Sequence, residues 1–189
     1  MRHTQFVNYA LYQTGWFACV LGGAWHWPWT GAAVAVALTA THIAWSRERA
    51  LEIQLVLLAA GVGLLVEVYE ISAGTYRVSS GTLHPALPPL WLIALWAQLG
   101  TTFQFSLKTI MANRWRAALF GGLGGPIAFI GGERLGAVTL LPPVTLGLVR
   151  LSIAWMIALV VLSVVASRIT RGRETPSYRS VKWLEQARR

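Results

Sequence analysis

The stretch that decides the fold is LEIQLVLLAAGVGLLVEVYEISA, which runs from Leu51 to Ala73. A helix that crosses the hydrocarbon core of a bilayer needs about 20 predominantly apolar residues, and this stretch reaches that length. We therefore expect it to form a transmembrane helix.

The composition of the whole chain agrees with a membrane location. Of its 189 residues, 55% are apolar and 12% are charged, whereas a soluble domain carries roughly 25% charged residues. The net charge of +9 could suit nucleic acid, but the basic residues lie between and after the apolar stretches, so no nucleic-acid partner is expected. The single cysteine, Cys19, excludes an intramolecular disulfide framework and a cysteine-based zinc site.

Five other stretches come close to the length of a membrane span. They run from Phe6 to Ala24, Trp27 to Trp45, Pro88 to Met111, Trp115 to Gly132 and Val144 to Ser167. Asn8 and Gln13 interrupt the first stretch, which favours a retained helix over a cleaved signal peptide. The sequence thus predicts an all-α, polytopic membrane protein with six transmembrane helices in residues 1–167.

The distribution of basic residues predicts the orientation of these helices. With both termini in the cytoplasm, the inner side holds thirteen of the sixteen Lys and Arg residues. They are Arg2, Arg47, Arg49, Lys108, Arg114, Arg116 and the seven basic residues from Arg168 to Arg189. The outer loops hold only Arg77 and Arg134, and Arg150 lies near the start of the last helix. We therefore expect both termini to be cytoplasmic.

Residues 168–189 are predicted to form a basic cytoplasmic tail. Ser180 could begin a short interfacial helix on an anionic inner leaflet, where each basic residue contributes about 1 kcal/mol. A tail that only fixes the topology explains the same residues equally well.

Ionisable residues inside membrane segments cost about 2.5–3.5 kcal/mol each on insertion scales, and here most of them gather toward the outer side. Glu67 and Glu70 share one helix face and are candidate acid/base groups. Candidate substrate-binding residues at this level are Arg150, Glu133, Arg134, Gln98, His26 and Trp29. We expect Arg150 to pair with Glu67 or Glu70. Ordinary headgroup-level charges and an interfacial aromatic belt are the plainer alternatives.

A second polar set is expected toward the cytoplasmic side. It comprises Asn8, Gln13, His42, Gln54, Thr101, Thr102 and Gln104. Amides and hydroxyls in membrane helices commonly bond to neighbouring helices, at about 0.6 kcal/mol each, which explains this set. His42 differs from the others because it could change its charge near neutral pH.

The fifth stretch is rich in glycine and contains a proline. Gly121 with Gly125, and Gly132 with Gly136, repeat the small-xxx-small spacing that lets helix backbones touch. Pro126 lacks a backbone donor and is expected to kink or interrupt the helix. A broken helix at membrane depth marks substrate sites in some transporters. The alternative is that these glycines allow close helix packing, within this chain, with another membrane protein or with a second copy of this chain.

Three motifs carry a resemblance to a known family. They are Asn8 with Gln13-x-Gly15-Trp16-Phe17-Ala18-Cys19-Val20-Leu21-Gly22-Gly23, then Pro89-Leu90-Trp91-Leu92, then Gly121-Gly122-Leu123-Gly124-Gly125-Pro126 with Gly132-x-x-Leu135-Gly136-Ala137-Val138. Up to about Ser167, the chain resembles a family of short, six-helix bacterial inner-membrane proteins of unknown function. Relatives are often encoded beside fatty-acyl-modifying genes, including cyclopropane-fatty-acid-type methyltransferases, so the resemblance implies a link to lipids by association. The family carries Asp near the outer end of the third helix, where this chain has Glu67 and Glu70, so the resemblance does not fix the functional acid.

Three classes of function are compatible with the sequence. The first is a lipid-linked role in fatty-acyl or phospholipid modification or binding, with a polar site in the outer half of the membrane and Arg150 holding an anionic group. The second is a non-catalytic subunit or assembly partner of a membrane complex, and the third is a small oligomeric transporter. The sequence shows no nucleotide loop or metal-ligand spacing, so no cofactor and no metal are predicted. Membrane lipid is the expected partner, and whether the protein is an enzyme stays open.

Overall fold

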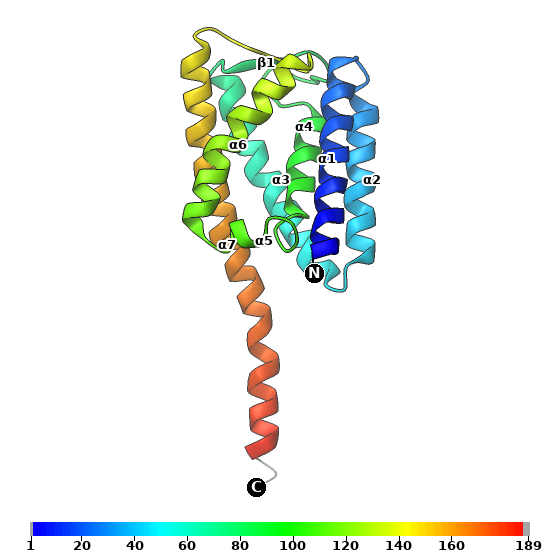
Figure 1. Cartoon of the computed structure of the whole chain (residues 1–189), viewed down its shortest axis with the longest axis vertical. Coiled ribbons are helices and arrows are strands. Elements are labelled where there is room, and N and C mark those ends of the chain that lie inside the picture. Colours follow the sequence, from blue (N-terminus) through cyan, green and yellow to red (C-terminus); the bar gives the residue numbers. More distant parts are fainter. Residues whose placement is uncertain (1, 187–189) are drawn as a thin grey trace.

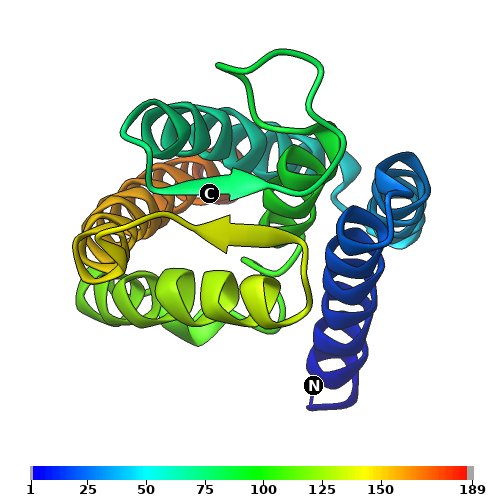
Figure 2. The ribbon, with the colours of Figure 1, turned by 90° about the horizontal axis from the view of Figure 1, so that it is seen from above.

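The computed structural model describes the backbone of residues 2–186 and the side chains of residues 4–172. Its elements follow in the order α1 (Arg2–Ala24), α2 (Pro28–Trp45), α3 (Arg49–Ser72), β1 (Tyr76–Val78), α4 (Leu90–Gly100), α5 (Lys108–Met111), α6 (Arg114–Arg134), β2 (Val138–Leu140) and α7 (Val144–Gln186). The long helices stand side by side, and the two strands lie across the end away from the N-terminus (Figure 1). Seen from above, α4 lies near the middle of the bundle (Figure 2). The predicted all-α class is confirmed.

Within the part of the chain that the structure describes, two helices are long and apolar enough to cross a membrane. They are α3 and the part of α7 from Val144 to Gly172. The other predicted spans also contain helices, but their crossing of a membrane stays a prediction. α7 continues through Ser167, so the predicted boundary of the tail falls inside a helix. The side chains of the predicted interfacial helix after Ser180 lie outside the described residues.

The fourth predicted helix is interrupted. α4 ends at Gly100, and residues 101–107 form successive turns before the short α5. The hydroxyls of Thr101 and Thr102 donate to backbone carbonyls three residues earlier, at 2.7 and 2.6 Å, and such bonds compete with the helical pattern. Asn8 of α1 donates to the Thr101 carbonyl at 3.1 Å. The interruption is therefore stabilised by an amide from another helix, which satisfies a backbone carbonyl that the helix leaves without its usual donor.

The fifth predicted helix, in contrast, is continuous. α6 passes through Pro126 without a break, so of the predicted kink or interruption, the interruption is wrong. Close packing on α7 explains its persistence, because a Cβ on Gly121 or Gly125 would lie within about 2.5 Å of Trp155 atoms. Gly121 and Gly125 therefore lie where α6 packs closely against α7.

The ends of α3 and α6 have the same turn. Gly74 and Gly136 follow the helices with φ of +66° and +87°, a conformation that favours glycine. Gly136 therefore belongs to a turn, and the prediction that it packs helices together with Gly132 is wrong. Each turn leads directly into a strand, and β1 pairs with β2 in an antiparallel register that places Tyr76 opposite Leu140. This strand pair places Tyr76 over the C-terminal end of α3.

Candidate functional site

Glu67 of α3 is fully buried and accepts two side-chain hydrogen bonds. The Tyr76 hydroxyl donates to its Oε2 at 2.5 Å, and the indole Nε1 of Trp96 donates to its Oε1 at 2.7 Å. Trp96 can reach Glu67 because Gly63 lies one turn earlier on α3, where a Cβ would be 2.1 Å from the Trp96 Cγ. Three elements thus meet at one carboxyl group, which fixes their relative positions.

Tyr76 is the donor that the strand pair supplies. Burial raises the pKa of its hydroxyl well above the ordinary value, and the neighbouring carboxyl of Glu67 adds to this effect. The hydroxyl therefore keeps its proton and remains a donor to Glu67.

Trp96 also belongs to an aromatic stack in the middle of the bundle. The centroid of its ring lies 4.3 Å from that of Trp155, with an interplanar angle of 37°. The ring of Phe129 meets that of Trp155 edge-on, with 6.5 Å between the centroids. Gly63 and Gly125 provide the space on either side, because a Cβ at either position would overlap a tryptophan ring. The stack therefore fits between α3 and α6 because neither Gly63 nor Gly125 carries a side chain.

A cleft of about 420 Å³ lies between α1, α4 and α6, and the aromatic stack forms part of its wall. It is lined by Tyr9, Tyr12, Gln13, Trp16, Val20, Trp91, Leu92, Leu95, Trp96, Leu99, Phe120, Gly124, Ile127, Ala128, Phe129, Gly131, Gly132, Ala137, Val138 and Trp155. Figure 2 shows α1 standing apart from α6 on this side of the bundle. Most lining side chains are apolar or aromatic, so the cleft suits a hydrocarbon ligand. Glu67 lies behind Trp96 and does not line it.

Glu70 is buried as completely as Glu67 but lacks its donors. Among the described residues, no donor lies within 3.5 Å of its carboxyl oxygens, although the buried hydroxyl of Thr75 lies near them. Arg150 lies within electrostatic reach of Glu70 but donates to the carbonyl of Ala73, at 2.8 Å. It thereby caps the C-terminal end of α3, where the helix dipole favours a cation.

The predicted ion pair of Arg150 with Glu67 or Glu70 does not form. Among residues 4–172, the contact within 4.0 Å between an acidic and a basic side chain joins Glu52 to His42 instead, and it is an ion pair only when the imidazole is protonated. The carbonyl at the end of α3 offers Arg150 a closer acceptor, and Glu67 has its bonds filled by Tyr76 and Trp96.

The other predicted site residues do not converge on Glu67. Glu133 accepts from the backbone N–H of Leu140 at 2.9 Å and so holds β2 against α6. Gln98 is buried and donates to the Leu11 carbonyl at 3.1 Å, which ties α4 to α1. Arg134, His26 and Trp29 are exposed.

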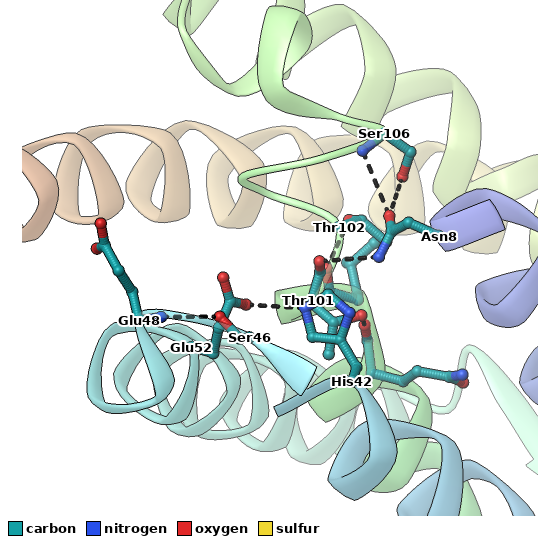
Figure 3. A network of polar contacts seen from close by, with 10 residues as sticks. Asn8, His42, Ser46, Glu48, Glu52, Thr101, Thr102 and Ser106 are labelled. Carbon is teal, nitrogen blue, oxygen red and sulfur yellow. Dashed lines mark hydrogen bonds and ion pairs between the residues drawn. The ribbon is translucent and has the colours of Figure 1, made fainter. Parts of the chain in front are cut away.

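A buried acid at the other end of α3 was missed by the sequence analysis. Glu52 is 2% exposed, and its Oε2 lies 3.1 Å from Nε2 of His42 on α2. Figure 3 shows this pair beside Asn8, which bonds Thr101 and Ser106 of the interrupted segment. His42 was singled out for its titration, but its partner was not. The available signal was an acid placed one residue inside an apolar stretch.

Comparison with known proteins identifies a family but no individual protein that is similar to the chain. No curated protein and no solved structure matches the chain. One family model matches residues 5–161, which is most of the chain and nearly the whole region in which the resemblance was seen. The predicted membership of a family of unknown function is thereby confirmed, whereas its bacterial inner-membrane location stays a prediction. The chain belongs to the family described as "Protein of unknown function (DUF2878)".

Proposed function

We propose that this chain is an integral protein of the bacterial cytoplasmic membrane that binds the hydrocarbon chain of a lipid in the cleft between α1 and α6. Six segments cross the bilayer, namely α1, α2, α3, α4 with α5, α6 and the first part of α7, and both termini face the cytoplasm. Support for the membrane location comes from α3 and α7, which are long and apolar enough to span it. Large apolar side chains also point outward along the bundle, such as Leu65 at 72% and Ile127 at 66% exposure.

The cleft is the observation that carries the proposal. Its volume of about 420 Å³ falls in the range of roughly 300–1,000 Å³ found for ligand pockets. With α1 and α6 crossing the bilayer, the space between them faces lipid, so an acyl chain enters sideways without passing through water. Lipid tails are about as apolar as leucine, so selectivity for a bound chain depends on its fit to the rings of the wall.

Glu67 acts in this proposal as a positioning residue. It holds the indole of Trp96, which lines the cleft, and it has no place in the lining itself. The same bond fixes Trp155 indirectly, because the two rings are stacked. We therefore assign Glu67 to shaping the cleft rather than to acid/base chemistry.

The two alternative functions gain less support from the contacts. A transport path through one copy would join Glu67 to the His42–Glu52 pair, but the intervening core is apolar, with Leu55, Ala59 and Phe103 buried there. Docking of a partner on the glycine face of α6 would need Gly121 and Gly125, which already pack against α7.

A matched pair of glycine substitutions tests the cleft. A Cβ at Gly124 or at Gly61 would meet no atom within 4 Å, yet only Gly124 lines the cleft. Gly124→Leu should fill the cleft, while Gly61→Leu makes the same change on the outer surface of α3. The measurement is photocrosslinking of purified protein in nanodiscs with a diazirine derivative of palmitate, followed by peptide mapping.

Labelling of the wild type is expected to concentrate on α1 and α6 at residues of the cleft wall. Gly124→Leu should reduce this labelling at least tenfold, and Gly61→Leu should leave it unchanged. Uniform labelling of all outward-facing helices, or equal labelling of the two variants, would overturn the proposal.

A further inference from the structure

A second apolar groove runs between α3 and α7, on a different side of the bundle from the cleft. It has a volume of about 420 Å³. Its lining consists of Val62, Leu65, Val66, Tyr69, Arg150, Ile153, Ala154, Ile157, Ala158 and Val161. Arg150 is the one charged member of this set, and it lies with Tyr69 toward the strand end of the bundle. A single cation therefore stands at one end of an otherwise apolar groove.

Arg150 has donors to spare at this position. A guanidinium carries five N–H donors, and the bond to the Ala73 carbonyl uses one nitrogen, Nη1. No acid lines the groove among the residues described, and Glu70, which is within electrostatic reach of Arg150, is fully buried and does not line the groove. On the groove side, the guanidinium is thus available to an external anion.

The groove also has the length of one lipid leaflet. At 1.5 Å per residue, the helix from Arg150 to Val161 spans about 16 Å, and half of a hydrocarbon core is about 15 Å. With the strand end of the bundle on the outer side, Arg150 stands near the outer headgroups and Val161 near the bilayer centre.

We propose that this groove binds an anionic phospholipid of the outer leaflet, with its phosphate on Arg150 and one acyl chain along α3 and α7. The fork of arginine donors matches phosphate oxygens, and a cation at membrane depth needs an anionic partner. A zwitterionic headgroup would bring its own cation close to Arg150, which favours an anionic headgroup. This site is separate from the cleft and rests on the proposed membrane location alone.

Native mass spectrometry of the detergent-solubilised full chain tests the site. The probes are dimyristoylphosphatidylglycerol, dimyristoylphosphatidylcholine and dimyristoylglycerol, which share their acyl chains and differ in the headgroup. One phosphatidylglycerol should remain bound to the wild type after the others dissociate. Arg150→Gln should weaken its retention about tenfold, the effect of losing one charge-assisted hydrogen bond. Arg134→Gln, which removes an exposed outer arginine away from the groove, should have no effect.

Arg150→Gln also removes the hydrogen bond to the Ala73 carbonyl and could disturb the fold. A second variant therefore tests the groove without changing Arg150. Ala154→Phe fills the groove and leaves Arg150 in place, so it should also abolish retention of phosphatidylglycerol. The proposal is overturned if dimyristoylglycerol is retained as well as phosphatidylglycerol, or if Arg134→Gln weakens binding as much as Arg150→Gln. A dimer that Ala154→Phe dissociates would likewise overturn it in favour of a second copy of the chain.

The two proposals fail separately. Ala154→Phe should leave palmitate labelling of the α1–α6 cleft intact, and Gly124→Leu should leave the retention of phosphatidylglycerol intact. If both variants affected both measurements equally, the groove would not be an independent site, and this inference would be wrong.

Discussion

The two ends of α3 each bury acidic side chains, and they satisfy them in different ways. At the end of α3 next to the strands, Glu67 accepts from a phenol and an indole, while Glu70, three residues later, has no donor within 3.5 Å. Near the start of α3, Glu52 contacts the imidazole of His42. All three acids are 0–2% exposed, so burial alone does not distinguish them. The difference lies in the donors that neighbouring elements bring, and it predicts three different responses to substitution.

The largest effect is expected at Glu67. Glu67→Leu leaves two buried donors, the Tyr76 hydroxyl and the Trp96 N–H, without their acceptor. Each unsatisfied buried group costs about 1–3 kcal/mol, so the free energy of unfolding should fall by about 2–5 kcal/mol. Unfolding in mixed detergent micelles with increasing SDS measures the change. Glu67→Gln keeps one acceptor oxygen and should lose less; an equal loss would mean that these bonds contribute little.

A smaller effect is expected at Glu52, near the start of α3. His42→Leu leaves Glu52 without the partner that lies 3.1 Å away, and the free energy of unfolding should fall by about 1–3 kcal/mol. His42→Leu with Glu52→Leu should recover most of that loss, because replacing both members of a buried pair by apolar residues is nearly neutral. The same SDS titration, run as a double-mutant cycle, gives the coupling energy. A double variant as unstable as the single one would show that the pair is not the cause.

The smallest effect is expected at Glu70. Glu70→Leu removes a buried acid that has no hydrogen-bond donor within 3.5 Å. The lost attraction to Arg150 is offset by the relief of burying a carboxyl group, so stability should stay within about 1 kcal/mol of the wild type. It is the same substitution as Glu67→Leu, three residues along the same helix, and the two are compared in parallel titrations. A loss at Glu70 as large as that at Glu67 would remove the distinction between the two acids.

The sequence predicted where the helices lie better than where they break. Runs of apolar residues located helices at each expected span, because the hydrogen bonds of a helix join residues that are close in the sequence. Pro126 gave the strongest local signal for a break, yet α6 passes through it because its glycines pack closely on α7. The actual interruption follows Gly100, where Asn8, ninety-three positions earlier than Thr101, supplies the stabilising bond.

The acidic residues of the candidate site could be predicted from the sequence, but the side chains that donate hydrogen bonds to them could not. Glu67 and Glu70 stand out because ionisable residues are rare in apolar stretches. Tyr76 and Trp96 are ordinary residues in the sequence, and nothing local indicates that they donate to Glu67. Arg150 illustrates the converse error, because opposite charge suggested a carboxyl partner where the structure gives it a carbonyl.

The sequence by itself determined the class of this protein, since composition, the length of apolar runs and the spacing of charges are properties of single segments. Only the tertiary structure decided which buried groups meet, because hydrogen bonds between side chains depend on the relative positions of whole elements. Two turns with left-handed glycines, Gly74 and Gly136, bring β1 and β2 together and place Tyr76 on Glu67. Gly63 and Gly125 then leave space for the tryptophan rings that line the cleft. These are long-range consequences of packing, and no local pattern encodes them.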